Sequence, residues 1–319
     1  MNETFKKLQA NVRPEYFFWA AVLCASLFLV TPPRTIPSQE NAAVIVATAS
    51  STENPYTTID LSAKAAYVYD LKARQPLFSR NADEVLPLAS VTKIMTAITA
   101  LSLAPPTTYV TITKEAVQEE GDSGLKVGER WLLRDLLTFM LIESSNDGAA
   151  AVSESIGATL GIASSTETDN RQHFIVEMNA LARRIDLPST SFLNESGLDS
   201  DAEQAGAFSS AAETARMLGY ALTAFPKIFS ETHWSELTLG NEAGEAYAAK
   251  NTNTAANNLP LLIASKTGYT DLAGGNLVIA FDAGFNHPII ISVLGSTVDG
   301  RFTDVEKLVW ATLQYLQQN

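Results

Sequence analysis

The sequence of 319 residues predicts an α+β fold, because strand-like segments, a block of helices and further strands follow one another along the chain. A hydrophobic content of 46% and a charged content of 18% are typical of a globular protein with a buried core. The net charge of −13 argues against a nucleic-acid partner, because phosphate binding requires a basic surface. We therefore expect a folded, acidic protein.

An apolar run near the N-terminus predicts a membrane segment. Residues 16–30 are nearly all hydrophobic, and Lys6, Lys7 and Arg13 precede them. Basic residues before such a segment keep the N-terminus in the cytoplasm and direct the following chain outward. The length fits a signal-peptide core as well as an anchor. We favour an uncleaved anchor within residues 1–30, and with either alternative we expect the remaining chain outside.

The next segment, residues 31–61, is rich in Pro, Ser, Thr, Ala and Asn and is expected to be a flexible linker. Its apolar stretch at 42–47 has no assigned role. A single folded domain is expected over residues 62–319. The sole cysteine, Cys24, excludes a disulfide within the chain and a cysteine-based metal site.

The first part of the domain predicts two strands followed by helices. The expected elements are strands at 65–69 and 76–78, and helices at 91–103, 131–142, 147–160, 171–186 and 209–223. The segment 131–142 is apolar nearly all round, so we expect that helix to be buried. Pro105 and Pro106 end the helix that starts at 91.

The last third of the chain predicts strands at 261–266, 276–281 and 288–294. The second and third are nearly continuous apolar runs with a short turn between them. This pattern indicates an antiparallel hairpin in a sheet that is covered on both faces. A final amphipathic helix is expected, and its apolar face consists of Val305, Leu308, Val309, Leu313 and Leu316.

Three short motifs carry the predicted chemistry. They are Ser90-Val91-Thr92-Lys93, Ser144-Ser145-Asn146 and Lys266-Thr267-Gly268. Ser90 opens a predicted helix, so Lys93 lies one turn later on the same face and can act as its base. That role requires a neutral amine, with a pKa well below the usual value of about 10.4. Burial and the nearby cation Lys266 are both expected to lower the pKa of Lys93.

The other motif residues are expected to handle the substrate. Ser144, coupled to Lys93, would relay a proton to the leaving group, and Asn146 would hold a substrate amide. The pair Lys266 and Thr267 would bind a terminal carboxylate, and Gly268 would let an extended peptide approach the strand edge. The backbone N–H groups of Ser90 and Tyr269 would form an oxyanion hole. Each motif taken alone also fits a plain helix cap, loop or strand end.

Two other serine-based sites are less favoured. Ser123 and Lys126 also have the Ser-x-x-Lys spacing, but they lie in a glycine-rich segment where the two side chains have no fixed relation. The three histidines are His173, His233 and His287, and none lies in a motif that a serine–histidine triad requires.

In this order, the three motifs resemble those of the D-alanyl-D-alanine carboxypeptidases, which are low-molecular-mass penicillin-binding proteins. The resemblance covers roughly residues 62–318 and includes Phe192–Asp199, which is similar to a Phe-x-Asn-x-x-Gly-Leu segment of that family. It implies a β-lactamase/DD-peptidase-like fold, with a mainly antiparallel sheet, flanking helices, a helical lobe and the serine between them. Peptidoglycan stem peptides ending in D-Ala-D-Ala are the implied substrate and β-lactams the implied inhibitors, with no metal and no cofactor.

The resemblance also places the expected domain on the outer face of a bacterial cell membrane, or in the medium after signal cleavage. No β-rich extension follows the last predicted helix, so we expect membrane attachment through the N-terminal segment. Three alternatives stay open: a D,D-endopeptidase, a β-lactamase, and a non-catalytic wall-binding or penicillin-sensing domain. Against the β-lactamase, Thr190 stands where class A enzymes carry the glutamate that activates the deacylating water.

Overall fold

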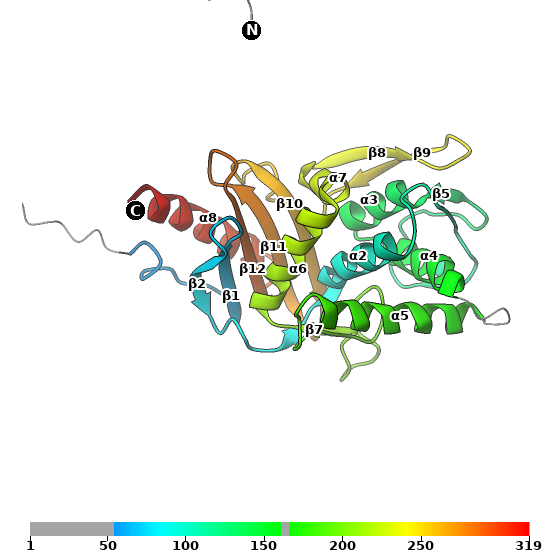
Figure 1. Cartoon of the computed structure of the whole chain (residues 1–319), viewed down its shortest axis with the longest axis horizontal. Helices are drawn as coiled ribbons and strands as arrows, with labels where there is room; N and C mark the ends of the chain where they lie inside the picture. Colours follow the sequence, from blue (N-terminus) through cyan, green and yellow to red (C-terminus); the bar gives the residue numbers. More distant parts are fainter. Residues whose placement is uncertain (1–53, 161–165, 319) are drawn as a thin grey trace, which may run out of the picture. The chain divides into compact units, whose positions relative to one another are not determined.

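A five-stranded antiparallel sheet organises the computed structural model, which describes residues 54–160 and 166–318 (Figure 1). The strand order is β10-β11-β12-β1-β2, so β10 and β2 are its edges. The bounds are Ala65–Asp70 (β1), Gln75–Arg80 (β2), Leu262–Thr270 (β10), Gly274–Asp282 (β11) and Pro288–Ser296 (β12). The predicted α+β class is therefore confirmed.

Helices cover both faces of this sheet, α6 (Ala211–Ala224) on one and α8 (Gly300–Gln318) on the other (Figure 1). Along β12, Ile289 and Ile291 belong to the core cluster beneath α8, whereas Ile290 belongs to the cluster on the opposite face. Side chains alternate between the faces of a strand, so a sheet covered on both sides requires apolar residues at every position. This explains the continuous apolar runs, and the predicted hairpin is confirmed.

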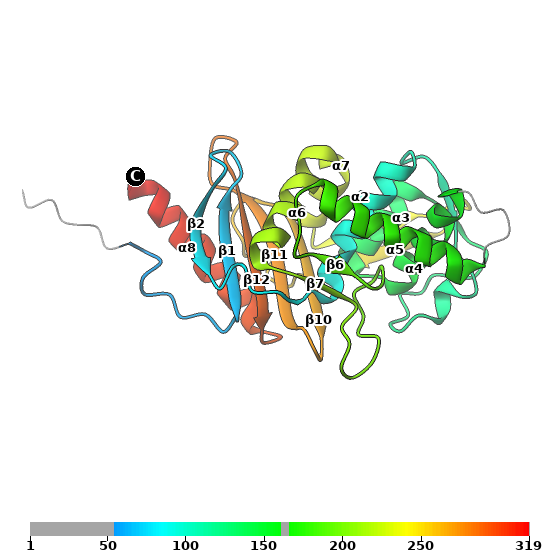
Figure 2. The same cartoon turned by 60° about the horizontal axis from the view of Figure 1, so that its bottom comes forward.

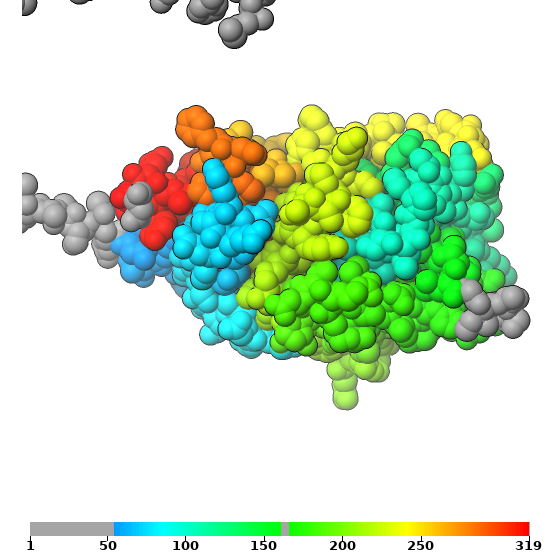
Figure 3. All heavy atoms as spheres, viewed as in Figure 1, coloured from blue at the N-terminus to red at the C-terminus, as the bar shows by residue number. Residues whose placement is uncertain are grey.

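A helical lobe lies beside the sheet (Figure 2). Its helices are α2 (Lys93–Leu103), α3 (Leu133–Glu143), α4 (Asn146–Gly157) and α5 (Glu167–Arg184). The buried residues of the lobe and of one sheet face form one hydrophobic cluster, so the two parts share a core. On the surface, α6 and α7 (Pro226–Ser230) lie between them, coloured yellow-green in Figure 3.

Several short elements were not predicted. The strands are Leu86–Pro87 (β3), Tyr109–Thr111 (β4), Arg130–Leu132 (β5), Ser191–Phe192 (β6), Ala207–Ser209 (β7), Glu236–Gly240 (β8) and Ala246–Lys250 (β9). The 3₁₀ turns are Ala89–Thr92 (η3), Ala116–Gln118 (η4), Ala158–Leu160 (η5) and Glu231–His233 (η6). Most of these strands have two or three residues, which is too short to show a period of two, and their partners are distant in the sequence.

Three expected boundaries were wrong. The helix expected from residue 131 begins at Leu133, because Arg130–Leu132 pairs with β4. Helix α5 begins at Glu167 instead of 171, after a capping box between Thr166 and Asp169. Strand β10 continues to Thr270, so the Lys-Thr-Gly motif lies inside the strand instead of at its end.

The predicted anchor at 1–30, the apolar stretch at 42–47 and most of the linker lie outside the described residues. The expected linker was wrong in its last part. Tyr56 is buried, its ring stacks on Phe78, and its hydroxyl donates to Thr312 Oγ1 at 2.9 Å. The packed domain therefore begins before residue 62. Within 54–160 and 166–318, no helix is long and apolar enough to cross a membrane.

Candidate active site

Ser90 and Lys93 meet where the 3₁₀ turn η3 continues into α2. Lys93 is the first residue of α2, and its side chain is fully buried. Its Nζ lies 2.9 Å from Ser90 Oγ, which is within reach of direct proton transfer. The same Nζ donates to Asn146 Oδ1 at 2.6 Å and to the carbonyl of Ser196 at 2.8 Å. The amine is thus fixed by three contacts, and one of them is the expected nucleophile.

Burial lowers the pKa of Lys93 from 10.5 to about 7. The carboxylates of Glu195, Asp147 and Glu119 act in the opposite direction, because negative charge favours the ammonium form. A neutral amine at neutral pH is therefore compatible with this site. Of the two expected causes, burial is confirmed as the main one, whereas the charges that shift the pKa of Lys93 most are these carboxylates and not Lys266.

Lys266 is buried as well, and the pKa of its amine is lowered well below the usual lysine value. Burial is again the main cause, and repulsion from Lys93 and Arg301 adds to it. A substrate carboxylate that reached Lys266 would raise this pKa, because the opposite charge favours the ammonium form. The arrangement suits an amine that becomes a cation when the substrate binds.

The second motif lies at the junction of α3 and α4, and its contacts differ from those expected. Ser144 Oγ accepts a hydrogen bond from Lys266 Nζ at 2.9 Å, so the structure couples this hydroxyl to Lys266 instead of to Lys93. Asn146 accepts from Lys93 through Oδ1 and donates through Nδ2 to the carbonyl of Glu120 at 2.7 Å. Asn146 therefore positions the amine of Lys93, instead of presenting a free amide to a substrate.

Strand β10 offers an edge to an extended peptide. The Ser265 N–H donates to Thr232 Oγ1 at 3.0 Å and therefore points away from β11. Backbone groups alternate in direction along a strand, so the N–H groups of Thr267 and Tyr269 face the same edge. Thr267 Oγ1 is hydrogen-bonded to Thr252 Oγ1, and the Tyr269 side chain is about half exposed. This edge agrees with the expected docking of a substrate backbone.

Gly268 brings β10 against the nucleophile segment. A Cβ atom at this position would lie 2.7 Å from the Leu88 carbonyl oxygen and 3.1 Å from the Ser90 nitrogen. Only glycine allows this approach, which brings the backbone of Tyr269 toward that of Ser90. The expected role of Gly268 thus changes: it makes room for the protein's own backbone near the predicted oxyanion hole.

Two residues of the site have a left-handed backbone conformation. Ala89, which precedes the nucleophile, has φ 48°, and Ser144 has φ 66°. Non-glycine residues adopt these left-handed conformations only when the surrounding structure imposes them. Ser144 is the C-cap of α3, where this conformation is common, so the unusual backbone is the one at Ala89, next to the nucleophile.

A second close approach joins Gly197 to the same segment. Gly197 has φ +80°, and a Cβ atom here would lie 1.9 Å from the Ala89 carbonyl oxygen and 2.5 Å from Thr92 Oγ1. Gly197 follows Ser196, whose carbonyl holds Lys93. The Phe192–Asp199 segment therefore supports the nucleophile and its base from one side.

We predict that Gly197→Ala lowers the free energy of unfolding by about 3 kcal/mol or more, because a steric clash adds to an unfavourable φ. Gly244 provides the matched control: it also has φ +80°, but a Cβ atom there would meet nothing within 4 Å. Gly244→Ala should cost only the conformational term, roughly 1–2 kcal/mol. Urea denaturation of both variants measures the difference, and equal losses would show that the contact with Ala89 is unimportant.

The second Ser-x-x-Lys sequence does not form a site. Ser123 Oγ is hydrogen-bonded to Ser145 Oγ and to Asp147. Lys126 is exposed, and its Nζ lies 3.3 Å from a carboxylate oxygen of Glu245. The two side chains thus have separate partners, and the preference for Ser90 agrees with the geometry.

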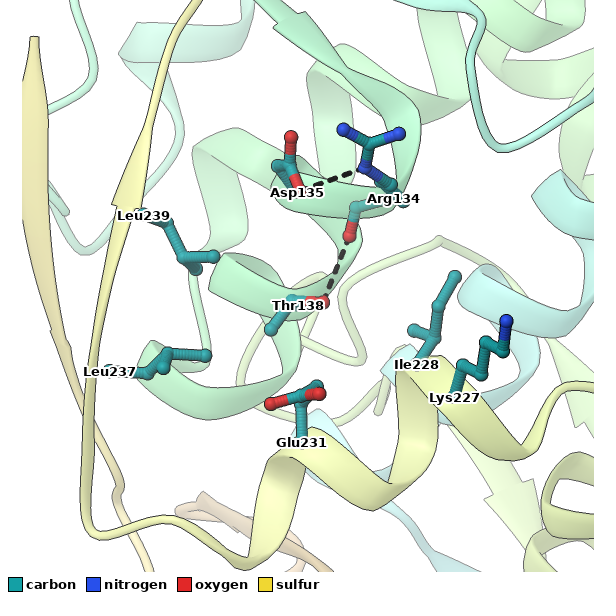
Figure 4. Close-up of a pocket in the computed structure, with 8 residues that line it drawn as sticks. All are labelled: Arg134, Asp135, Thr138, Lys227, Ile228, Glu231, Leu237 and Leu239. Carbon is teal, nitrogen blue, oxygen red and sulfur yellow. Dashed lines mark hydrogen bonds and ion pairs between the residues drawn. The ribbon is translucent and has the colours of Figure 1, made fainter. Parts of the chain in front are cut away.

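A concave site of about 320 Å³ lies between α3, β8 and the α7–η6 segment, and its lining residues are drawn in Figure 4. Its lining residues are Arg134, Asp135, Thr138, Lys227, Ile228, Glu231, Leu237 and Leu239. Its polar groups are partly paired with one another, since Arg134 Nε contacts Asp135 and Thr138 donates to the Arg134 carbonyl. The lining contains no nucleophile hydrogen-bonded to a base, so we do not assign the catalytic site here.

Sequence reasoning missed several groups that contact the motif residues. The carbonyls of Ser196 and Glu120 hold Lys93 and Asn146, and Arg301 Nη1 donates to the Gly268 carbonyl at 2.8 Å. A backbone carbonyl leaves no signal in residue type. Only the Phe192–Asp199 segment, noted for its family resemblance, pointed to one of these contacts.

Comparisons with known proteins agree with this geometry. A family model described as D-alanyl-D-alanine carboxypeptidase matches residues 48–298. The chain is 30% identical over 276 residues to the D-alanyl-D-alanine carboxypeptidase DacC of Escherichia coli, with 82% of this chain and 64% of that protein covered. It is 28% identical over 225 residues to the D-alanyl-D-alanine endopeptidase of Pseudomonas aeruginosa, with 69% and 67% covered.

The chain thus spans about two thirds of the length of these curated relatives. Among solved structures, it is similar to penicillin-binding protein D2 from Listeria monocytogenes in its ampicillin-bound form. The TM-score is 0.66 at 26% sequence identity, with 79% of this chain and 98% of that chain covered. The predicted β-lactamase/DD-peptidase-like fold is therefore confirmed.

Proposed function

The chain belongs to the D-alanyl-D-alanine carboxypeptidase family, and we propose that it is a serine-type carboxypeptidase that removes the terminal D-alanine from peptidoglycan stem peptides. One observation carries the proposal. Ser90 Oγ lies 2.9 Å from a fully buried lysine amine whose pKa is lowered to about 7. A hydroxyl beside a neutral amine is an activated nucleophile.

The first step forms the acyl-enzyme. The stem peptide docks along the edge of β10, with its carboxylate toward Lys266 and Thr267. Neutral Lys93 takes the proton from Ser90 Oγ as this oxygen attacks the carbonyl carbon of the D-Ala-D-Ala bond. The backbone N–H groups of Ser90 and Tyr269 stabilise the oxyanion, a contribution of about 3–4 kcal/mol per donor in comparable sites.

The second step releases D-alanine and then the shortened peptide. Both lysines contact the second motif, because the Ser144 hydroxyl accepts from Lys266 and Asn146 accepts from Lys93. We assign to Ser144 the transfer of a proton to the departing amine, and the proton that Lys93 took from Ser90 replaces it, so Lys93 is neutral again. Water then attacks the ester, and Lys93 accepts a proton from this water. Lys93 passes the proton to Ser90 Oγ as the ester bond breaks, which regenerates Ser90.

An endopeptidase and a β-lactamase would use the same acyl-enzyme chemistry, and the observations support the endopeptidase better than the β-lactamase. The Pseudomonas aeruginosa relative is named an endopeptidase, which keeps cleavage of peptide cross-links as a second candidate. A β-lactamase is less supported. Thr190, at the position where a deacylating glutamate was sought, is buried and hydrogen-bonded to Ser209 and Glu213. Glu195 is buried and paired with Arg171.

Mass spectrometry of purified muropeptides tests the proposal. Incubation with uncross-linked pentapeptide should remove one D-alanine per stem, and the activity should disappear after treatment with penicillin. Cleavage of cross-linked dimers with intact pentapeptides would favour the endopeptidase instead. Rapid turnover of a chromogenic β-lactam would favour the β-lactamase, and no covalent adduct with penicillin would contradict all three.

We also propose that the domain acts outside the cytoplasm, anchored through residues 16–30. The supporting observations are the apolar character of this segment and the basic residues before it. Protease added to intact spheroplasts should digest the domain, and membranes washed with carbonate should retain the full chain. Protection of the domain in intact spheroplasts would contradict the proposal.

A further inference from the structure

We propose that Arg171 is a positioning residue, which ties together the two segments that hold Lys93 and Asn146. Arg171 lies on α5, outside all three motifs, and it contacts neither side chain directly. This inference rests on the proposed function, because the experiment that tests it measures acyl transfer to Ser90. We refer to Arg171, Glu119 and Glu195 as the arginine clamp.

One arm of the clamp reaches the base. Arg171 Nη2 donates to the carboxylate of Glu195, which is almost completely buried. The next residue, Ser196, accepts a hydrogen bond from Lys93 Nζ through its carbonyl, at 2.8 Å. The Glu195 carbonyl itself accepts from Thr96 Oγ1 on α2 at 2.6 Å. The clamp therefore fixes the backbone that orients the amine of Lys93.

The other arm reaches the second motif. Arg171 Nη1 donates to Glu119 Oε1 at 2.6 Å. The next residue, Glu120, accepts from Asn146 Nδ2 through its carbonyl at 2.7 Å, and Asn146 Oδ1 in turn accepts from Lys93 at 2.6 Å. Each clamped glutamate thus directly precedes a residue whose carbonyl holds one side chain of the site.

A guanidinium suits this task better than an ammonium. Its planar fork presents donors in two fixed directions, so one side chain can hold two carboxylates at once. The Arg171 side chain is 24% exposed, while those of Glu195 and Glu119 are 1% and 22% exposed. A third carboxylate, Glu154 on α4, lies 4.0 Å away and is also buried. Three carboxylates thus surround Arg171.

The charges that face the base come from several elements. Glu195 and Glu119 from the clamp and Asp147 on α4 all favour the ammonium form of Lys93, and burial opposes them. Burial also raises the pKa of Glu195 and of Glu154, which Arg171 counteracts. Any variant that removes the cation therefore changes both geometry and charge, whereas Arg171→Lys keeps the charge and loses the fork.

The experiment separates binding from chemistry in the reaction with a fluorescent penicillin. Stopped-flow labelling of the full chain gives the dissociation constant of the first complex and the rate constant of acylation, measured above pH 7. The variants are Arg171→Lys and Arg171→Met. Arg184 provides the matched control, because it lies on the same helix, is 56% exposed, and contacts Glu177 at 3.8 Å.

We expect Arg171→Met to slow acylation on the order of 100-fold, because a base displaced by about 1 Å loses that much rate. Arg171→Lys, which can satisfy one glutamate at a time, should lose about tenfold. The dissociation constant should stay unchanged in both, and Arg184→Met should acylate like the wild type. An unchanged acylation rate in Arg171→Met, or a parallel change in binding, would overturn the positioning role.

A second pair keeps the test decisive if Arg171→Met does not fold. Glu119→Ala removes only the contact between Arg171 and the segment that holds Asn146. Glu119 is partly exposed, and the variant should slow acylation about tenfold. Glu119→Gln retains an oxygen that accepts from Arg171 and should restore the rate. Equal rates for Ala and Gln would contradict the clamp. Failure of the wild type to acylate would instead contradict the proposed function.

Discussion

Ser90→Ala is expected to abolish both D-alanine release and covalent labelling by penicillin. The variant lacks the oxygen that forms the ester, while the burial and contacts of Lys93 with Asn146 and Ser196 are retained. Loss of the nucleophile in a comparable serine hydrolase lowers kcat on the order of 10⁶-fold. Intact-protein mass spectrometry measures the penicillin adduct, and chromatography measures free D-alanine from pentapeptide.

Ser123→Ala is the matched control, because Ser123 belongs to the second Ser-x-x-Lys sequence. Its hydroxyl contacts Ser145 and Asp147, and Lys126 lies apart from it on the surface. Labelling and hydrolysis should therefore remain close to the wild-type values. A penicillin adduct that persists in Ser90→Ala and disappears in Ser123→Ala would show that the nucleophile has been assigned to the wrong serine.

The main elements of the fold could be predicted because their residues show clear periods. The runs at 276–281 and 288–294 are apolar at both faces of a strand, and the final helix has a single apolar face. The hairpin of β8 and β9 was missed, because each strand has only five residues and their alternation is too short to stand out in the sequence. Strand β5 was predicted as the start of a helix, because Trp131 is apolar and comes just before the apolar residues of α3.

The motifs identified the residues of the candidate site, but not their partners. Spacing within a helical turn fixes the relation of Ser90 to Lys93, so this contact could be predicted. The relation of Ser144 to Lys266 joins residues 122 positions apart, which no local pattern encodes. The same holds for Arg171, whose two glutamates are 52 and 24 residues away in the sequence.

The lowered pKa of Lys93 shows how far a local pattern reaches. Burial and the Lys266 cation were both expected to lower this pKa, and burial is its main cause. The carboxylates of Glu195, Asp147 and Glu119 act in the opposite direction and were not foreseen. They come from other segments of the chain, so no pattern around Lys93 indicates them.

A base with this pKa gives acylation a defined dependence on pH. Above about pH 7 the amine of Lys93 is neutral and can accept the proton of Ser90, so the rate should reach a plateau. Each pH unit below that value lowers the neutral fraction, and hence the rate, about tenfold. The measurement is the second-order rate constant for labelling by penicillin between pH 5 and pH 9, with thermal melts to verify folding at each pH.

Lys93→Arg should remove this dependence together with most of the activity. The guanidinium stays protonated at every accessible pH, so the variant keeps a cation in the site and loses the base. General-base catalysis contributes typically 10²–10⁴-fold, and we expect acylation to fall by about that factor. Lys250→Arg, at an exposed position on β9, serves as the control and should leave the profile unchanged. A wild-type rate that stays flat from pH 5 to pH 8, or an arginine variant that still acylates rapidly, would mean that Ser90 is activated by another group.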